Sequence, residues 1–181
     1  RPGNSGRWCR YIPVLPDFSD QIELEQFSPQ RVNHFFNEGT KLQIQEKLLR
    51  LKEGIQQAAE KAGRNPDEIR LVAVSKTKPA EAVREAAQTG HLIYGENRVQ
   101  EALEKIEALD DLPLLEWHLV GHLQKNKARF CPGNFQWLHS LDSLELAQRL
   151  DRFCLEREVS LNVLVQLNLS KEDSKSGLRG W

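Results

Sequence analysis

A lysine stands where α/β proteins commonly place a ligand-binding residue. Lys76 follows the apolar run at 71–74 and Ser75, and Pro79 comes three residues later. Four consecutive apolar residues indicate a strand buried on both faces, as in a parallel sheet, and proline favours the first position of a helix. Lys76 is therefore predicted to lie just past the carboxyl end of a buried strand, where α/β folds bind their ligands.

Several uses of such a lysine remain open from the residues alone. Its amine can contact a phosphate or a carboxylate, form a Schiff base with an aldehyde, or simply be a solvated side chain at the start of a loop. We expect the amine to be partly desolvated at the rim of the sheet, and Lys78 adds a second positive charge. Both effects favour the neutral amine that carbonyl chemistry requires.

Two more loops follow predicted strands. The residues Gly95-Glu96-Asn97 come after the strand at 92–94, and Asn97 is interpreted as a helix cap that also faces a ligand beside Lys76. The stretch 121–127 follows a third strand and reads as the start of a basic helix with a solvated face, with a phosphate site as the alternative.

Other kinds of site lack their motifs. His118 and His122 have the spacing of the two histidines of a zinc-protease helix, but no glutamate follows the first histidine. The run also reads as a strand followed by Gly121, which directs the two rings apart, so no metal site is predicted. No Gly-x-Ser-x-Gly elbow, dinucleotide-binding glycine loop or Walker A loop occurs.

The composition is that of an ordinary globular protein. The 181 residues are 39% hydrophobic and 28% charged with a net charge of −1, so no global field attracts nucleic acid or an anionic membrane. No apolar run approaches the length of a bilayer span, and no secretory signal opens the chain. The three cysteines are widely spaced, which fits a reducing cytoplasm. Methionine is absent even at position 1, so we expect a partial or processed chain.

Helices and strands alternate along the part of the chain that must position these loops. A capping box at Thr40 and Gln43 predicts the start of a helix of about 22 residues that ends at Gly63. Strands are predicted at 69–74, 92–94, 114–120, 135–139 and 161–169. Glu101 and Lys105 form a supporting i,i+4 pair on the helix after Asn97. A further capping box, Asp142 with Glu145, precedes the helix before the last strand.

Five alternating strands and helices with short connections indicate a parallel α/β fold. They do not distinguish an open doubly wound sheet from a barrel. A complete eight-stranded barrel takes about 250 residues, so a barrel requires a C-terminal part beyond this chain. Residues 1–39, broken by prolines and glycines, are predicted to be an extension of uncertain order.

Four motifs, in this order and spacing, resemble the pyridoxal phosphate homeostasis protein family. They are Leu71-Val72-Ala73-Val74-Ser75-Lys76-Thr77-Lys78-Pro79, Tyr94-Gly95-Glu96-Asn97-Arg98-Val99-Gln100-Glu101, Glu116-Trp117-His118-Leu119-Val120-Gly121-His122-Leu123-Gln124-Lys125-Asn126-Lys127, and Asn168-Leu169-Ser170 with Lys175-Ser176-Gly177. The resemblance covers residues 41–178 and is highly specific, because four separate motifs are in register.

The resemblance implies a TIM-like (β/α) barrel, similar to the barrel domain of alanine racemase, of which residues 40–181 would be the N-terminal part with about five of eight β/α units. It implies a non-catalytic cytoplasmic carrier of pyridoxal 5′-phosphate (PLP) in vitamin B6 homeostasis. It implies that Lys76 forms the Schiff base with PLP and, more weakly, that Asn97 lies near the cofactor. We expect PLP and PLP-dependent apo-enzymes as partners, a monomer, and neither a metal nor a nucleic acid or membrane partner.

Two departures from the family pattern bear on binding. The family holds the cofactor phosphate with a serine- and glycine-rich loop and an Arg-x-Gly segment, and this chain stops before them; Leu178-Arg179-Gly180-Trp181 no longer follows the pattern. Residues 1–39 have no counterpart. We therefore expect this chain to bind PLP weakly, because most of the anchoring charge is absent.

An alternative from another functional class is a PLP-dependent amino-acid racemase. Racemisation needs a second base, which alanine racemase-like enzymes take from a tyrosine in a separate β-domain of the partner subunit. The tyrosines here are Tyr11 and Tyr94, and no β-domain follows, which argues against an enzyme. A third alternative is a folded α/β fragment without retained activity.

Overall fold

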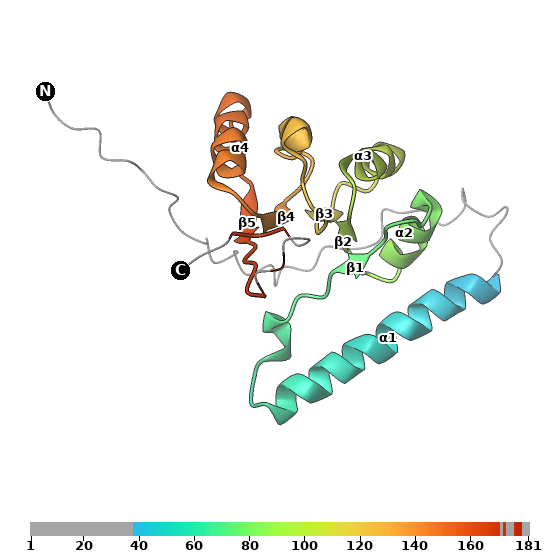
Figure 1. Ribbon diagram of the computed structural model, residues 1–181. Coiled ribbons are helices and arrows are strands. Elements are labelled where there is room, and N and C mark those ends of the chain that lie inside the picture. The colour runs from blue at the N-terminus through green and yellow to red at the C-terminus, as the bar shows by residue number, and fades with distance from the viewer. Residues whose placement is uncertain (1–37, 171, 173–175, 179–181) are drawn as a thin grey trace, which may run out of the picture. The chain divides into compact units, whose positions relative to one another are not determined.

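The computed structural model describes residues 38–170, 172 and 176–178, with side chains from residue 44 onward (Figure 1). The predicted extension at 1–39 therefore lies outside the described residues, except for its last two, which are helical. Helix α1, Glu38–Lys61, begins two residues before Thr40, so the predicted cap at Thr40 is wrong. Thr40 lies within the first turn, because the helical backbone extends two residues further toward the N-terminus than the capping-box pattern indicates. The helix ends before Gly63, whose φ of +66° suits glycine.

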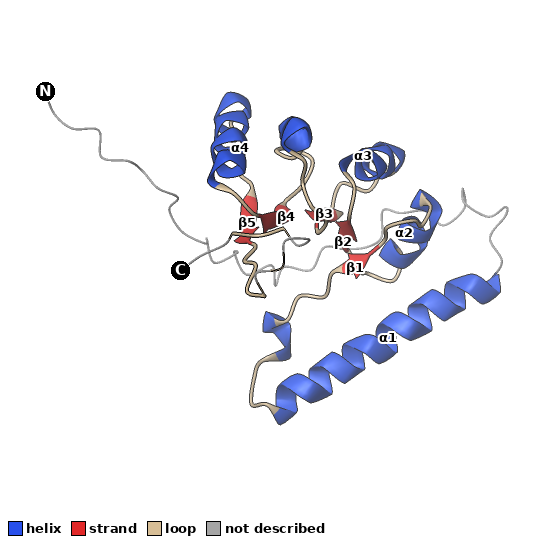
Figure 2. Cartoon of the chain, in the orientation of Figure 1, coloured by secondary structure: helices blue, strands red, loops and turns tan. Residues whose placement is uncertain are grey.

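The sheet has five parallel strands in the order β1-β2-β3-β4-β5 (Figure 2). The strands are β1 Ala73–Val74, β2 Ile93–Glu96, β3 Glu116–Leu119, β4 Trp137–Leu141 and β5 Asn162–Val165. Each strand pairs with the next one along the chain, whereas an open doubly wound sheet reverses its order at a switch point. The predicted parallel α/β fold is confirmed, and the strand order agrees with part of a TIM-like barrel.

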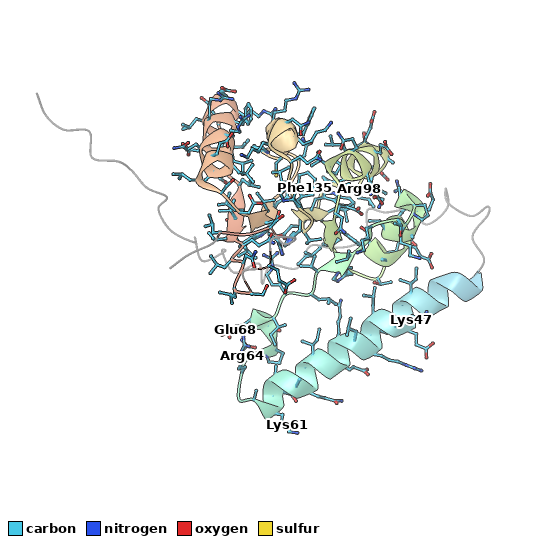
Figure 3. All side chains as sticks on the ribbon, viewed as in Figure 1. Lys47, Lys61, Arg64, Glu68, Arg98 and Phe135 are labelled. Carbon is cyan, nitrogen blue, oxygen red and sulfur yellow. The ribbon has the colours of Figure 1, made fainter. Side chains whose placement is uncertain are left out.

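The connecting helices cover one face of the sheet (Figure 1). They are α2 Ala80–Ala87, α3 Val99–Ala108, the 3-10 helix η4 Lys125–Phe130 and α4 Leu144–Arg157; a short 3-10 helix, η3 Pro66–Glu68, precedes β1. Large side chains from the strands and helices fill the layer between them, among them Trp117, Leu119 and Leu146. Phe135, just before β4, is 2% exposed in this layer (Figure 3).

The other face of the sheet is open in the described part of the chain. Val74 is 51% exposed, and every residue of β5 is exposed. The prediction that the strand before Lys76 is buried on both faces is therefore wrong. The reason is that the connecting helices α2, α3, η4 and α4 pack on one face, and β1 lies at an edge of the sheet with a neighbour on one side only.

Two helix caps differ from the sequence predictions by one position. The N-cap of α3 is Arg98 and not Asn97. The N-cap of α4 is Ser143, whose hydroxyl accepts a hydrogen bond from Leu146 N–H at 3.3 Å. Asp142 is unavailable as a cap because its carboxylate lies 3.2 Å from His122 Nδ1. Within the described ranges, no helix combines the length and apolar character needed to cross a membrane.

Candidate functional site at the carboxyl edge of the sheet

Lys76 and Asn97 follow neighbouring strands and lie at the same level. Val74 pairs with Gly95 in the parallel register, and Ser75 N–H donates to Gly95 O at 2.9 Å. Lys76 and Asn97 each come two residues after this pair, past the last paired residues of the two strands. Both predicted site residues thus lie at the carboxyl edge of the sheet, where ligands of α/β proteins bind.

The side chains just before these two residues show which face of the sheet is the open one. A Cβ atom built at Gly95 would lie 3.1 Å from Val72 Cγ1 and 3.4 Å from Val74 Cγ2, so these two valines share the face of Gly95. Side chains two residues apart point to the same face of a strand. Ser75 and Glu96 are buried on the face that the helices cover. Lys76 and Asn97 come after the last paired residues of β1 and β2, in a turn and a bend.

The Lys76 side chain is exposed and makes no hydrogen bond or ion pair with the described residues. The expected partial desolvation of its amine is therefore wrong, because nothing in the described chain covers the open face at this point. An exposed amine without a partner has a different advantage: an incoming aldehyde can reach it without first displacing a protein contact.

Asn97 is half-buried, and its side-chain amide makes no hydrogen bond in the described part of the chain. Because Arg98 takes the N-cap position, the amide is not used by the helix. The loop after β3 packs against it from the other side: a Cβ atom at Gly121 would lie 2.3 Å from Asn97 O. Three loops that follow β1, β2 and β3 therefore meet at this edge.

The turn that carries Lys76 is held by a buried polar network. Lys105 Nζ donates to Ser75 O at 2.8 Å, to Glu96 Oε1 at 2.7 Å and to Glu101 Oε1 at 2.9 Å. Ser75 Oγ also donates to Glu96 Oε1, at 2.6 Å. The side chain of Lys105 is 7% exposed and that of Glu96 is fully buried. Glu96 Oε2 has no hydrogen-bond partner among the described residues.

The predicted i,i+4 pair of Glu101 and Lys105 is present, but it is not a surface pair. Lys105 lies on the helix face that packs on the sheet, three residues after Ala102 and four before Leu109, which are both buried. A lysine within an apolar helix stripe was a signal for a buried ion pair, because a buried charge requires a partner. Its partner Glu96 belongs to strand β2, nine residues earlier in the chain. The spacing of the two residues does not reveal that they pair.

A second polar cluster lies on the same face as Gly95, further from the carboxyl edge, where neighbouring side chains leave His118 only 3% exposed. His118 Nε2 lies 2.8 Å from Glu116 Oε1, and its Nδ1 lies 2.9 Å from His139 Nε2. Burial is the main cause that lowers the pKa of both histidines. His122 instead contacts Asp142, so His118 and His122 have separate partners. The described residues contain no cluster of three or more candidate metal ligands.

The remaining predicted loops have mostly structural contacts. Lys125 pairs with Glu145, and Lys127 lies over the ring of Phe130. The last motif returns to the end of β5: Leu178 N–H donates to Gln166 O at 2.8 Å. A cavity of about 520 Å³ lies between the loop after β3 and residues 166–170, at the carboxyl edge. Ser174 and Lys175 lie outside the described residues.

Comparison with known proteins gives a consistent set of relatives, although no protein-family model matches the chain. The pyridoxal phosphate homeostasis protein of Escherichia coli is 45% identical over 138 residues, which are 75% of this chain and 59% of that protein. The protein of the same name from Pseudomonas aeruginosa is 49% identical over 134 residues, 74% of this chain and 58% of the relative. The chain thus spans about three-fifths of the length of these relatives.

Solved structures agree with the sequence relatives. PipY of Synechococcus elongatus, solved with PLP bound, is 43% identical, with a TM-score of 0.64 over 75% of this chain and 58% of that one. A protein of unknown function from Bifidobacterium adolescentis is 30% identical, with a TM-score of 0.73 over 81% of this chain and 63% of that one.

Proposed function

Because the chain belongs, over the residues matched, to the family of pyridoxal phosphate homeostasis proteins, we propose that it binds PLP through the amine of Lys76. The observation that carries the proposal is the register of β1 and β2: Val74 pairs with Gly95, and Lys76 and Asn97 each follow two residues later, at the carboxyl edge. The resemblance of the four motifs selected the same lysine independently of the fold.

The residues present at this edge fit an aldehyde ligand with polar substituents. Lys76 offers an exposed amine, and Asn97 offers an amide that no described residue uses. An aldehyde such as that of PLP condenses reversibly with a neutral amine, with formation of a C=N bond and release of water. We assign Asn97 the supporting role of a hydrogen-bonding group beside the bound ligand.

The site supports a carrier better than a racemase. A racemase needs a second base over the ligand, and Tyr94 is unsuited to act as that base, because it is buried on the helix-covered face and its hydroxyl donates to His91 O and Val83 O. Burial raises the pKa of Tyr94 strongly. Tyr11 lies outside the described residues. We infer a non-catalytic role, in which the exposed Lys76 holds PLP reversibly and releases it to PLP-dependent apo-enzymes in the cytoplasm, with the carrier acting as a monomer.

Reduction and mapping test this proposal. PLP is added to the purified chain, the adduct is reduced with borohydride, and the modified peptide is identified by mass spectrometry. We expect modification at Lys76 above every other lysine; modification spread evenly over surface lysines would refute the proposal. An interconversion assay with D- and L-alanine separates the two functions, because a carrier leaves the alanine enantiomers unchanged and a racemase equilibrates them.

A further inference from the structure

The turn that presents Lys76 has a backbone conformation that its own sequence disfavours. Lys78 N–H donates to Ser75 O at 3.0 Å and closes a four-residue turn. Thr77, the third residue of this turn, has a φ of +63°. Turns with positive φ at this position normally carry glycine or asparagine there, and a β-branched residue rarely adopts it. Contacts from outside the turn must therefore hold Thr77 in place.

Glu101 provides one of these contacts. Its Oε1 atom accepts the Thr77 backbone N–H at 2.5 Å, across 24 residues of sequence. Glu101 lies in the first turn of α3, a helix that packs its buried face on the sheet. A bond between a carboxylate and a backbone N–H is stronger than a neutral hydrogen bond, so it fixes the turn to a rigid element.

Lys105 provides the second contact, at the other end of the same turn. Its ammonium group donates to Ser75 O, the carbonyl that also accepts from Lys78, and to the carboxylates of Glu96 and Glu101. Three N–H groups thus meet three acceptors. Because Glu96 is fully buried and Lys105 almost so, water does not compete for the bonds of Lys105 to Ser75 and Glu96, whereas the Glu101 side chain is 28% exposed. The ends of the turn are fixed, while Lys76 between them stays exposed.

We propose that Glu101 and Lys105 are positioning residues for Lys76, which hold the 75–78 turn in its left-handed form and so present the Lys76 amine level with Asn97. The identity of the ligand rests on the proposed function, whereas the contacts of Glu101 and Lys105 with the turn do not depend on it. Without it, Thr77 relaxes to a negative φ, and the Lys76 side chain leaves the level of Asn97.

The test compares three substitutions on α3. Glu101→Ala removes the acceptor of the Thr77 N–H, whereas Glu101→Gln keeps a side-chain oxygen there. Glu104→Ala is the matched control, because Glu104 is exposed on the same helix and makes no contact with the turn. Each variant is labelled with PLP and borohydride, and the rate at Lys76 is divided by the rate at Lys61 in the same sample, because Lys61 is exposed on α1 and lies outside the turn. This ratio cancels any loss of folded protein that affects both lysines.

We expect Glu101→Ala to lower the ratio about tenfold, because a displaced amine loses its alignment with the site. Glu101→Gln and Glu104→Ala should stay close to the unaltered chain. Adding Thr77→Asn to Glu101→Ala should restore the ratio, since asparagine adopts positive φ without help. A purely structural role of Glu101 would not respond to Thr77→Asn in this way. An unchanged ratio in Glu101→Ala, or no recovery in the double variant, would overturn the proposal.

A measurement without PLP separates this inference from the proposed function. The hydrogen exchange of the Thr77 amide is followed by NMR, together with the labelling of Lys76 by acetic anhydride. In Glu101→Ala we expect faster exchange at Thr77 and altered acetylation of Lys76 relative to Lys61. If PLP never labels Lys76 in the unaltered chain, the proposed function fails while these two readouts still decide the positioning role. If both remain unchanged in Glu101→Ala, the positioning role is refuted.

Discussion

Gly121 packs so closely against Asn97 that a Cβ atom at position 121 would lie 2.3 Å from the Asn97 carbonyl oxygen. The same atom would lie 2.7 Å from Asn97 Cα. No side chain other than hydrogen fits between these two loops. This contact joins the loop after β3 to the loop after β2, and it fixes the backbone of Asn97 at the edge where Lys76 also lies.

Gly121→Ala is therefore expected to be destabilising. Forcing a methyl group against backbone atoms should cost about 2–3 kcal/mol, because both loops must shift. Gly54→Ala is the matched control, since nothing lies within 4 Å of a Cβ at this helical position. Alanine is the better helix former by about 1 kcal/mol, so the control should gain stability. Urea denaturation measures the free energy of unfolding of both variants. A change of the same sign in the two variants would contradict the packing described.

Removing the buried ammonium should have a large effect on folding. Lys105→Met leaves the fully buried Glu96 carboxylate without its cation, and breaking a buried pair in this way costs about 3–5 kcal/mol. The comparable exposed pair is Arg50 with Glu46, whose side chains are 75% and 61% exposed. Arg50→Met should change the unfolding free energy by less than about 0.5 kcal/mol. A loss below about 1 kcal/mol in Lys105→Met would show that the network is not stabilised as proposed.

Relief of the backbone strain at Thr77 should stabilise the chain. Thr77 has a φ of +63°, and its hydroxyl makes no hydrogen bond to the described residues. Thr77→Asn keeps the backbone N–H that Glu101 accepts and replaces a β-branched residue by one that tolerates this region, so we expect a gain of about 1 kcal/mol. Thr77→Val retains the β-branch and should give no gain. Equal unfolding free energies for the Asn and Val variants would argue against strain at this position.

The chain should lose stability as the pH falls below neutrality. The pKa values of His118 and His139 are lowered, mainly by burial. A histidine with a lower pKa in the folded state binds protons preferentially when unfolded. The stability that such a histidine contributes is therefore fully present above its pKa in the unfolded chain, near 6.5. That stability is lost as the pH falls toward the lower pKa of the folded state.

Urea denaturation at about pH 7.5 and about pH 5.5 measures this dependence. His139→Gln, which keeps a side-chain N–H for His118, should weaken the pH dependence. If stability depends on pH as strongly in His139→Gln as in the unaltered chain, groups other than these histidines cause the dependence.

The sequence allowed the prediction of the alternating elements and of the position of Lys76 after the first strand, because both follow from local patterns. The open face was not predictable in this way. Whether Val74 is covered depends on which elements pack over it, and a run of apolar residues does not contain that information. The caps at Arg98 and Ser143 differ by one residue from the predictions, which is the usual uncertainty of helix ends.

The network behind the site was missed for a related reason. Glu96 and Lys105 belong to a strand and a helix whose contact is set by the fold, and the Glu101–Lys105 spacing alone indicates a surface pair. The positive φ of Thr77 was equally hidden, since threonine is not a residue that marks such a turn. Local pattern leads to Lys76, the residue proposed to bind the aldehyde. The contacts that hold its turn join separate elements, and local pattern does not contain them.

The most direct test of PLP binding at Lys76 is the visible absorbance that PLP develops when an amine of the chain binds its aldehyde. Lys76→Ala and Lys78→Ala each remove one lysine from the same turn, and both side chains are exposed, so they differ in position and not in accessibility. We predict that PLP titration gives the absorbance band with the unaltered chain and with Lys78→Ala, and that Lys76→Ala abolishes it. A band that persists in Lys76→Ala at the same PLP concentration would contradict the assignment of Lys76 as the PLP-binding residue.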